Sequence, residues 1–230
     1  MSKIGDFEQR LISDGMTDRD LEEYAKLLVR VRDKRQHCYT TAVKFPPERI
    51  EQAVKLIKLG LESFEDDGWY SNYASYRSMG QIYKQARNYQ KAYESYLSAM
   101  NTLDETRGNY EIQLSGCLMW MKLHMDSFEY SEEAEKYYSC AVKGDEFSKA
   151  FINQEFRLAV ADTVISLHHG QTDKARRSLA RAREIAKPNY TGKLYTILVR
   201  HRYNEKLELS PESARFIDCL LYTSPSPRDR

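Results

Sequence analysis

The stretch that decides the fold is YASYRSMGQIYKQARNYQKAYESYLSAMNTLD, residues 73–104. Large and small residues recur in it at helical spacing, at Tyr76, Met79, Gly80, Tyr83, Ala92, Tyr96 and Ala99. This pattern predicts two amphipathic helices that pack on each other. Such hairpins bury their apolar faces only by stacking on neighbouring hairpins. The sequence therefore predicts an all-α fold, an α-solenoid of stacked antiparallel helical hairpins, and solenoids mostly serve to hold other molecules.

The spacing around Gly80 resembles the tetratricopeptide repeat family. Large residues stand four and one positions before this glycine, and the small and aromatic positions of the second helix follow at the family's intervals. The resemblance implies that Gly80 and Ala92 let the paired helices approach closely and that Ala99 receives the next repeat. The stretch departs from the family at Asp104, where a proline usually stands.

Fainter copies of the second-helix pattern lie on both sides. They are Ala53, Ile57 and Gly60 upstream, and Ala134, Tyr138 and Ala141, then Ala175, Leu179 and Ala182 downstream. The anchor alanines Ala53, Ala92, Ala134 and Ala175 are 39, 42 and 41 residues apart. Because the usual family repeat is about 34 residues, we interpret these as divergent tetratricopeptide-like repeats with a step of about 40 residues. Other α-hairpin repeats are the competing interpretation.

The start of the chain carries a helix-capping signal. Thr17 is followed three residues later by Asp20, which is typical of a capping box. Leu21, Tyr24, Leu27 or Leu28, and Val31 then supply an apolar stripe. These residues predict a long first major helix.

The last residues have an unusual character. Residues 219–229, CLLYTSPSPRD, resemble the translation of a transposon-based sequencing adapter. A natural, disordered Ser/Pro-rich tail is the alternative. We expect a single tetratricopeptide-like domain over residues 1–218, truncated at its C-terminus, and a non-native tail over residues 219–230.

The charge balance argues against several classes of partner. The chain has 35 Lys plus Arg and 34 Asp plus Glu, a balance that makes nucleic-acid and membrane-surface binding unlikely. One helix is locally basic, with Lys174, Arg176, Arg177, Arg181, Arg183 and Lys187. These cations form either a solvated face or a contact site for an anionic group.

The sequence predicts a cytoplasmic protein. Residues 1–15 lack the pattern of a secretory signal, and no run of apolar residues is long enough for a membrane span. Cys38, Cys117 and Cys140 are isolated from one another, which favours reduced thiols.

Catalytic motifs are missing from the sequence. It contains no glycine-rich phosphate loop, no GxSxG and no HExxH. His168 and His169 adjoin Gly170 at a predicted helix end, where the helix dipole explains them without a metal. We expect no catalytic residues, no metal and no cofactor.

A binding groove is the remaining candidate site. The family resemblance implies that the first helix of each hairpin lines a concave surface. The implied groove residues are Arg77, Gln81 and Lys84, then Met119 and Leu123, then Arg157. Such a surface suits an extended peptide or a helix with an acidic end and an apolar middle. Alternatively, Arg77 and Lys84 simply face water.

These observations predict a non-catalytic scaffold that binds a protein or peptide ligand. One alternative is the sensor or interaction half of a larger regulator whose effector domain lies beyond Asp218, and another is an enzyme with a helical-repeat core. The apolar stripe of residues 194–207 also predicts self-association through an uncapped C-terminal repeat.

Overall fold

The computed structural model describes residues 3–65, 71–103, 108–144, 151–187, 190 and 207–219. Every regular element in these ranges is a helix, and none of the described residues lies in a strand, so the all-α prediction is confirmed. The chain divides into two compact units, Met1–Asp104 and Glu105–Arg230. That residues 1–218 form one solenoid domain stays a prediction. Residues 194–206 of the apolar stripe and tail residues 220–230 lie outside the described residues.

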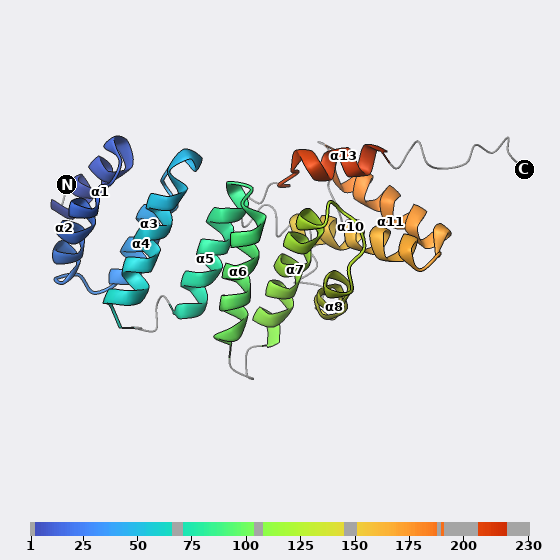
Figure 1. Cartoon of the computed structure of the whole chain (residues 1–230), viewed down its shortest axis with the longest axis horizontal. Helices are drawn as coiled ribbons and strands as arrows, with labels where there is room; N and C mark the ends of the chain where they lie inside the picture. Colours follow the sequence, from blue (N-terminus) through green and yellow to red (C-terminus); the bar gives the residue numbers. More distant parts are fainter. Residues whose placement is uncertain are drawn as a thin grey trace, which may run out of the picture. The chain divides into compact units, whose positions relative to one another are not determined.

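The first unit consists of helices that pack on their neighbours along the chain (Figure 1). They are α1 (Lys3–Asp14), α2 (Asp18–Leu28), α3 (Lys34–Ala42), the short 3-10 helix η1 (Pro47–Arg49), α4 (Ile50–Ser63), α5 (Asn72–Gln85) and α6 (Tyr89–Asn101). α1 packs on α2, α3 on α4 and α5 on α6, while α4 also contacts α2 and α5. Successive helix pairs therefore pack on one another within this unit.

The α5–α6 hairpin is built around Gly80. A Cβ atom on this residue would lie 2.7 Å from two carbons of the Tyr96 ring, closer than real Cβ contacts allow. Ala92 and Ala99, on the same helix as Tyr96, are completely buried. The predicted close approach of the two helices at Gly80 is confirmed.

The other predicted repeat positions also lie in helix interfaces. The buried ones are Ala53, Ile57, Gly60, Met79, Tyr83, Ala134, Ala141, Ala175, Leu179 and Ala182. Tyr76 and Tyr138 are half-buried. The periodic alanines therefore mark the packed faces of α4, α6, α8 and α11.

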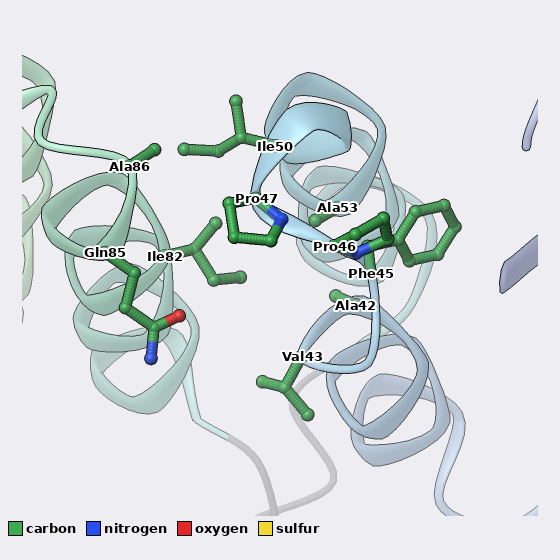
Figure 2. Close-up of a pocket in the computed structure, with 10 residues that line it drawn as sticks. All are labelled: Ala42, Val43, Phe45, Pro46, Pro47, Ile50, Ala53, Ile82, Gln85 and Ala86. Carbon is green, nitrogen blue, oxygen red and sulfur yellow. The ribbon is translucent and has the colours of Figure 1, made fainter.

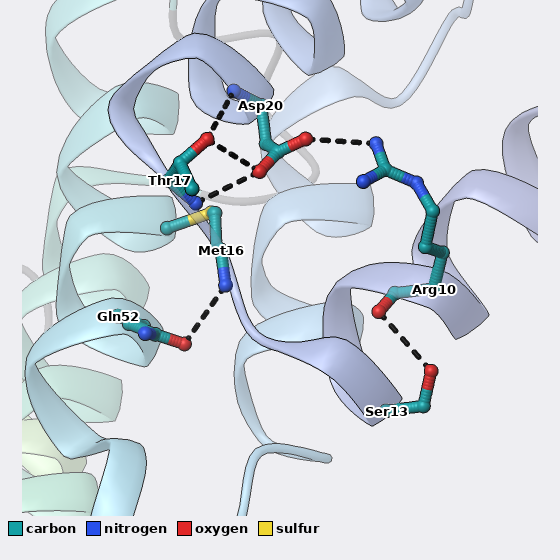
Figure 3. A network of polar contacts seen from close by, with 6 residues as sticks. All are labelled: Arg10, Ser13, Met16, Thr17, Asp20 and Gln52. Atoms are coloured by element: carbon teal, nitrogen blue, oxygen red, sulfur yellow. Dashed lines mark hydrogen bonds and ion pairs between the residues drawn. The ribbon is translucent and has the colours of Figure 1, made fainter.

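The capping box predicted at Thr17 is confirmed (Figure 3). The Asp20 amide donates to the Thr17 hydroxyl over 3.2 Å, and the Thr17 amide donates to the Asp20 carboxylate over 2.9 Å. Arg10 donates to the same carboxylate over 2.8 Å. Hydrogen bonds from Thr17, followed by that from Arg10, lower the pKa of Asp20 to about 2. The Met16 amide donates to Gln52 Oε1 over 3.1 Å, which ties this loop to α4.

The helix that follows the capping box differs from the prediction. It ends at Leu28, so Val31 lies beyond it, and it is not the first helix, because α1 precedes it. The Phe7 ring of α1 stacks on Tyr24 at 5.9 Å between ring centroids. Leu11 is the one fully buried side chain among the described residues of α1.

Arg35 ties the α3–α4 hairpin to α5. Its side chain donates to the Phe64 carbonyl over 3.0 and 2.7 Å and to Asn72 Oδ1 over 2.8 Å. The residue is only 5% exposed, and a buried cation requires such partners. Arg35 thus fixes the end of α4 and the start of α5 together.

The second unit contains two further hairpins and a short final helix. Its described helices are α7 (Gly108–Met125), α8 (Glu132–Ala141), α10 (Ile152–His168), α11 (Thr172–Ile185) and α13 (Pro211–Cys219). α7 packs on α8 and α10 on α11, while α10 also contacts α7 and α8. α13 packs on α11. Pro211 begins the last described helix.

The turns inside three hairpins use left-handed backbone. Arg87 (φ 58°), Phe128 (φ 62°) and Gly170 (φ 69°) lie just after α5, α7 and α10. An amide at each turn reaches back to a helix carbonyl: Asn88 to Tyr83 over 2.9 Å, Phe128 to Leu123 over 2.7 Å and Gln171 to Ser166 over 2.8 Å. These hydrogen bonds end each helix and reverse the chain.

A polar seam joins three helices of the second unit at Asp162 of α10. The Tyr138 hydroxyl of α8 donates to its carboxylate over 2.9 Å, and Lys174 of α11 lies 2.9 Å from the same oxygen. The Ser178 hydroxyl donates to the other oxygen. Burial raises the pKa of Asp162, but the hydrogen bonds from Ser178, Lys174 and Tyr138 outweigh it and hold that pKa below its ordinary value.

Candidate functional site

The three groove residues predicted in the first unit lie on one face of α5. Arg77, Gln81 and Lys84 are spaced four and three residues apart, which places them on neighbouring turns of the helix. Arg77 and Gln81 are exposed and Lys84 is half-buried. Ser71 starts this helix by accepting a hydrogen bond from the Ala74 amide. The structure therefore brings these three residues together on the surface of the unit.

An apolar cleft lies at the C-terminal end of α5, facing the turn between α3 and α4 (Figure 2). It is lined by Ala42, Val43, Phe45, Pro46, Pro47, Ile50, Ala53, Ile82, Gln85 and Ala86. Its volume is about 30 Å³, enough for one or two water molecules or the end of one apolar side chain. Val43, on its rim, is 48% exposed. Sequence reasoning missed this cleft because its two walls are far apart in the chain.

Gln85 connects the cleft to the polar face of α5. It follows Lys84 directly and lies one helical turn after Gln81, and its side chain lines the cleft. A ligand that follows α5 toward its C-terminus would therefore pass from polar and cationic groups to an apolar depression.

The groove residues predicted in the second unit are buried. Met119, Leu123 and Arg157 are 0%, 1% and 9% exposed. The structure does not place Met119 and Leu123 along a groove. α7 buries residues around most of its circumference, as a helix inside a core does. Met119 and Leu123 are core residues in this structure and offer no surface to a ligand.

Arg157 has a different environment from the other two. Its guanidinium carbon lies 5.9 Å from the centroid of the Trp120 ring, and its Nη2 atom lies 3.6 Å from Glu208 Oε2. Glu208 belongs to residues 207–219, hereafter the C-terminal segment, which comprises a short extended stretch and α13. A predicted groove residue thus contacts another part of its own chain.

The basic helix α11 uses several of its cations internally. Lys174 pairs with Asp162, Arg181 with Glu155 and Glu184, and Arg183 donates to the Ile217 carbonyl. Arg176 lies 3.7 Å from Asp173 of the same helix. These contacts disperse the positive charge and weaken the alternative of an anion-binding face.

His168 and His169 lie at the end of α10, as predicted, but their contacts go beyond the helix dipole. The Tyr130 ring stacks on His168 at 3.5 Å between centroids, and His169 Nε2 lies 3.0 Å from Glu135. The Tyr130 hydroxyl donates to Glu135 over 2.7 Å. The hydrogen bonds from Tyr130 and His169 hold the pKa of Glu135 below its ordinary value, and that of Tyr130 rises to about 12.

Among the described residues, no group of three or more His, Cys, Asp or Glu side chains is placed to hold a metal ion. Among the same residues, no helix combines the length and the apolar character needed to cross a membrane. Comparison with models of known families, with curated proteins and with solved structures finds no match to this chain.

Proposed function

We propose that this protein is a non-catalytic scaffold of the tetratricopeptide-like α-solenoid type that binds a protein or peptide segment. The observation that carries the proposal is the surface of the first unit on which Arg77, Gln81 and Lys84 lead to the apolar cleft beside Gln85. We call this surface the α5 face.

The chemistry of the α5 face indicates the kind of ligand. Arg77 and Lys84 supply positive charge for an acidic group, and Gln81 and Gln85 offer amide donors and acceptors to a peptide backbone. The cleft accepts one apolar side-chain end. Ligand pockets for small molecules usually measure about 300–1,000 Å³, whereas this cleft measures about 30 Å³. The α5 face therefore suits a peptide that lies across it better than an enclosed substrate.

The test is selection of short random peptides displayed on phage, using the immobilised full chain. We expect the wild type to enrich peptides that carry an acidic residue close to an aliphatic one. The charge-reversed variant Arg77→Glu/Lys84→Glu should lose this enrichment, because its α5 face repels an acidic group.

A matched control is available on α2. Arg19 and Lys26 are both exposed and are also seven residues apart, so Arg19→Glu/Lys26→Glu makes the same charge change on another helix. This control should enrich the same peptides as the wild type. Equal enrichment by all three proteins, or no enrichment by a wild type shown to be folded by circular dichroism, would refute the α5 face as a binding site.

A further inference from the structure

The C-terminal segment is docked on α7, on the turn after it, on α10 and on α11 of the second unit. Its extended part contacts α7 and α10: Ser210 Oγ lies 2.9 Å from His124 Nε2, and the Glu208 amide donates to Asn153 Oδ1 over 2.8 Å. Its helical part stacks Phe216 on Phe128 at 5.0 Å between ring centroids. The segment thus contacts Arg157, one of the groove residues that the family resemblance implies.

The docking site is built from an aromatic cluster with polar groups at its edge. Trp120 contacts His124, Phe128 and Phe156 at 4.6, 5.7 and 5.8 Å between ring centroids. Phe216 adds a further ring to this cluster from the docked segment. An aromatic anchor in a largely buried aromatic site, with hydrogen bonds around it, is the usual anatomy of a peptide-binding hot spot.

The polar contacts define how the docked segment is oriented. His124 Nδ1 lies 2.9 Å from the Trp120 carbonyl oxygen, and its Nε2 lies 2.9 Å from Ser210 Oγ. At the other end, Arg183 donates to the Ile217 carbonyl over 2.7 Å. The two ends of α13 are therefore held by side chains of α7 and α11.

α13 has nine residues, and a helix of this length is marginal in water unless it is docked. Of its nine side chains, only Ser213 and Ile217 are buried, with Phe216 half-buried. It therefore lies on the unit as a short amphipathic ligand would lie.

We infer that the C-terminal segment is an internal ligand that occupies a peptide-binding surface on α7, α10 and α11 and competes with a partner protein for it. The partner segment has the same chemistry: an acidic residue, a Ser-Pro helix start two residues later, and an aromatic–aliphatic pair one and a half turns into the helix. This inference rests on the proposed function, since it names a second surface of the same scaffold and the device that regulates it.

The tether sets the size of the regulatory effect. A binding segment that belongs to the same chain as its site acts at an effective concentration that can be on the order of 1 mM. A free peptide with an intrinsic Kd of about 10 μM would then bind the occupied site roughly 100-fold more weakly. Displacement of the internal segment should restore the intrinsic affinity.

The experiment uses the full chain and a fluorescent peptide of residues 207–218, LELSPESARFID, with binding followed by polarisation. The variant Phe216→Lys/Ile217→Lys releases the internal segment and leaves every residue of the docking surface unchanged. We expect it to remain folded with a cooperative melt and to bind the peptide at least tenfold more tightly than the wild type does. The control Leu209→Lys/Asp218→Lys adds two lysines at exposed positions of the same segment and should behave like the wild type.

Peptide variants test the assigned chemistry. Phe216→Ala in the peptide should abolish binding to the released protein, and Glu208→Lys should weaken it several-fold because of Arg157. A released variant that unfolds would show that α13 is part of the core, and a folded one that does not bind the peptide would show that the surface takes no ligand. Either result overturns the inference.

Two further outcomes are informative. A wild type that sediments as a dimer, with Phe216→Lys/Ile217→Lys as a monomer, would show that the segment docks on a second copy and would overturn the internal assignment. The variant Arg77→Glu/Lys84→Glu tests the α5 face, and the peptide of residues 207–218 tests the docking surface of the second unit. A negative result for one surface leaves the result for the other unaffected.

Discussion

Gly80 is the residue on which the best hairpin depends. Replacing it by Ala puts a methyl group about where the Tyr96 ring now lies, at 2.7 Å. Because Tyr96 is 3% exposed, its ring has little room to move. We expect Gly80→Ala to lower the free energy of unfolding by about 1–3 kcal/mol, measured by urea denaturation followed by circular dichroism.

Gly60 provides the control for this substitution. It also lies inside a helix, but a Cβ atom there would meet its nearest neighbour, Cys38 Cβ, at an ordinary 3.4 Å. Gly60→Ala should be neutral or stabilising by up to about 1 kcal/mol, since Ala is the better helix former. If both variants shift the denaturation midpoint alike, the packing account of Gly80 is wrong.

Asp162 is one residue through which we expect the second unit to be sensitive to acid. Its folded-state pKa is depressed, so the carboxylate stabilises the fold above the unfolded-state pKa of about 3.9, and this stabilisation is lost as the pH falls through the folded-state pKa. We expect Asp162→Asn to cost about 1–2 kcal/mol at pH 7 and to flatten the fall in melting temperature between pH 5 and pH 3.

The matched control for Asp162 lies on α11. The side chain of Asp173 is 85% exposed, and Asp173→Asn should retain the wild-type pH profile. A melting temperature of Asp162→Asn that falls with acid as steeply as that of the wild type would contradict the role given to the seam.

At the scale of the element, the turn after α5 holds a residue in an unfavourable conformation. Arg87 has φ 58°, a region that costs a side chain with a Cβ about 1–2 kcal/mol. Glycine relieves this strain but adds entropy to the unfolded chain. We expect Arg87→Gly to stabilise the protein by roughly 0.5 kcal/mol, seen as a higher denaturation midpoint. The same change at Gln90, an exposed position inside α6, should destabilise it, and a destabilised Arg87→Gly would refute the strain.

Local sequence predicted the elements whose packing repeats along the chain. Ala92, Ala134 and Ala175 mark second helices because small residues one and two turns apart face a packed neighbour, and all three are buried. The family resemblance also implied Arg77, Gln81 and Lys84 of the α5 face, but not the apolar cleft beside them. Whether the repeats belong to the tetratricopeptide family stays a prediction.

The elements that sequence missed depend on distant partners. The helix α7 has no wide polar side that would mark a surface in the sequence. The groove positions of Arg77 and Gln81 on α5 therefore predicted Met119 and Leu123 as their equivalents on α7, and both are buried in the core. The docking of α13 joins Ser210 to His124, 86 residues away. No local periodicity in the sequence predicts such a contact, and neither Ser210 nor His124 indicates it by itself.

At the scale of the whole molecule, charge limits the partners that the scaffold can hold. The 35 basic and 34 acidic residues give a formal net charge of +1. In the most basic helix, α11, Lys174 and Arg181 form ion pairs with carboxylates of α10. Binding to a polyanion requires many free cations acting together, because its strength comes from the release of counterions. We expect the chain to leave a heparin column below about 0.2 M salt and to bind no duplex DNA in a gel-shift assay at physiological salt.

Asp162→Asn and Glu155→Gln, which remove partners of Lys174 and Arg181, should increase retention on heparin slightly. Strong retention of the wild type would mean that the cations of α11 act as a patch despite their pairing, and the partner would then be sought among nucleic acids rather than acidic peptides.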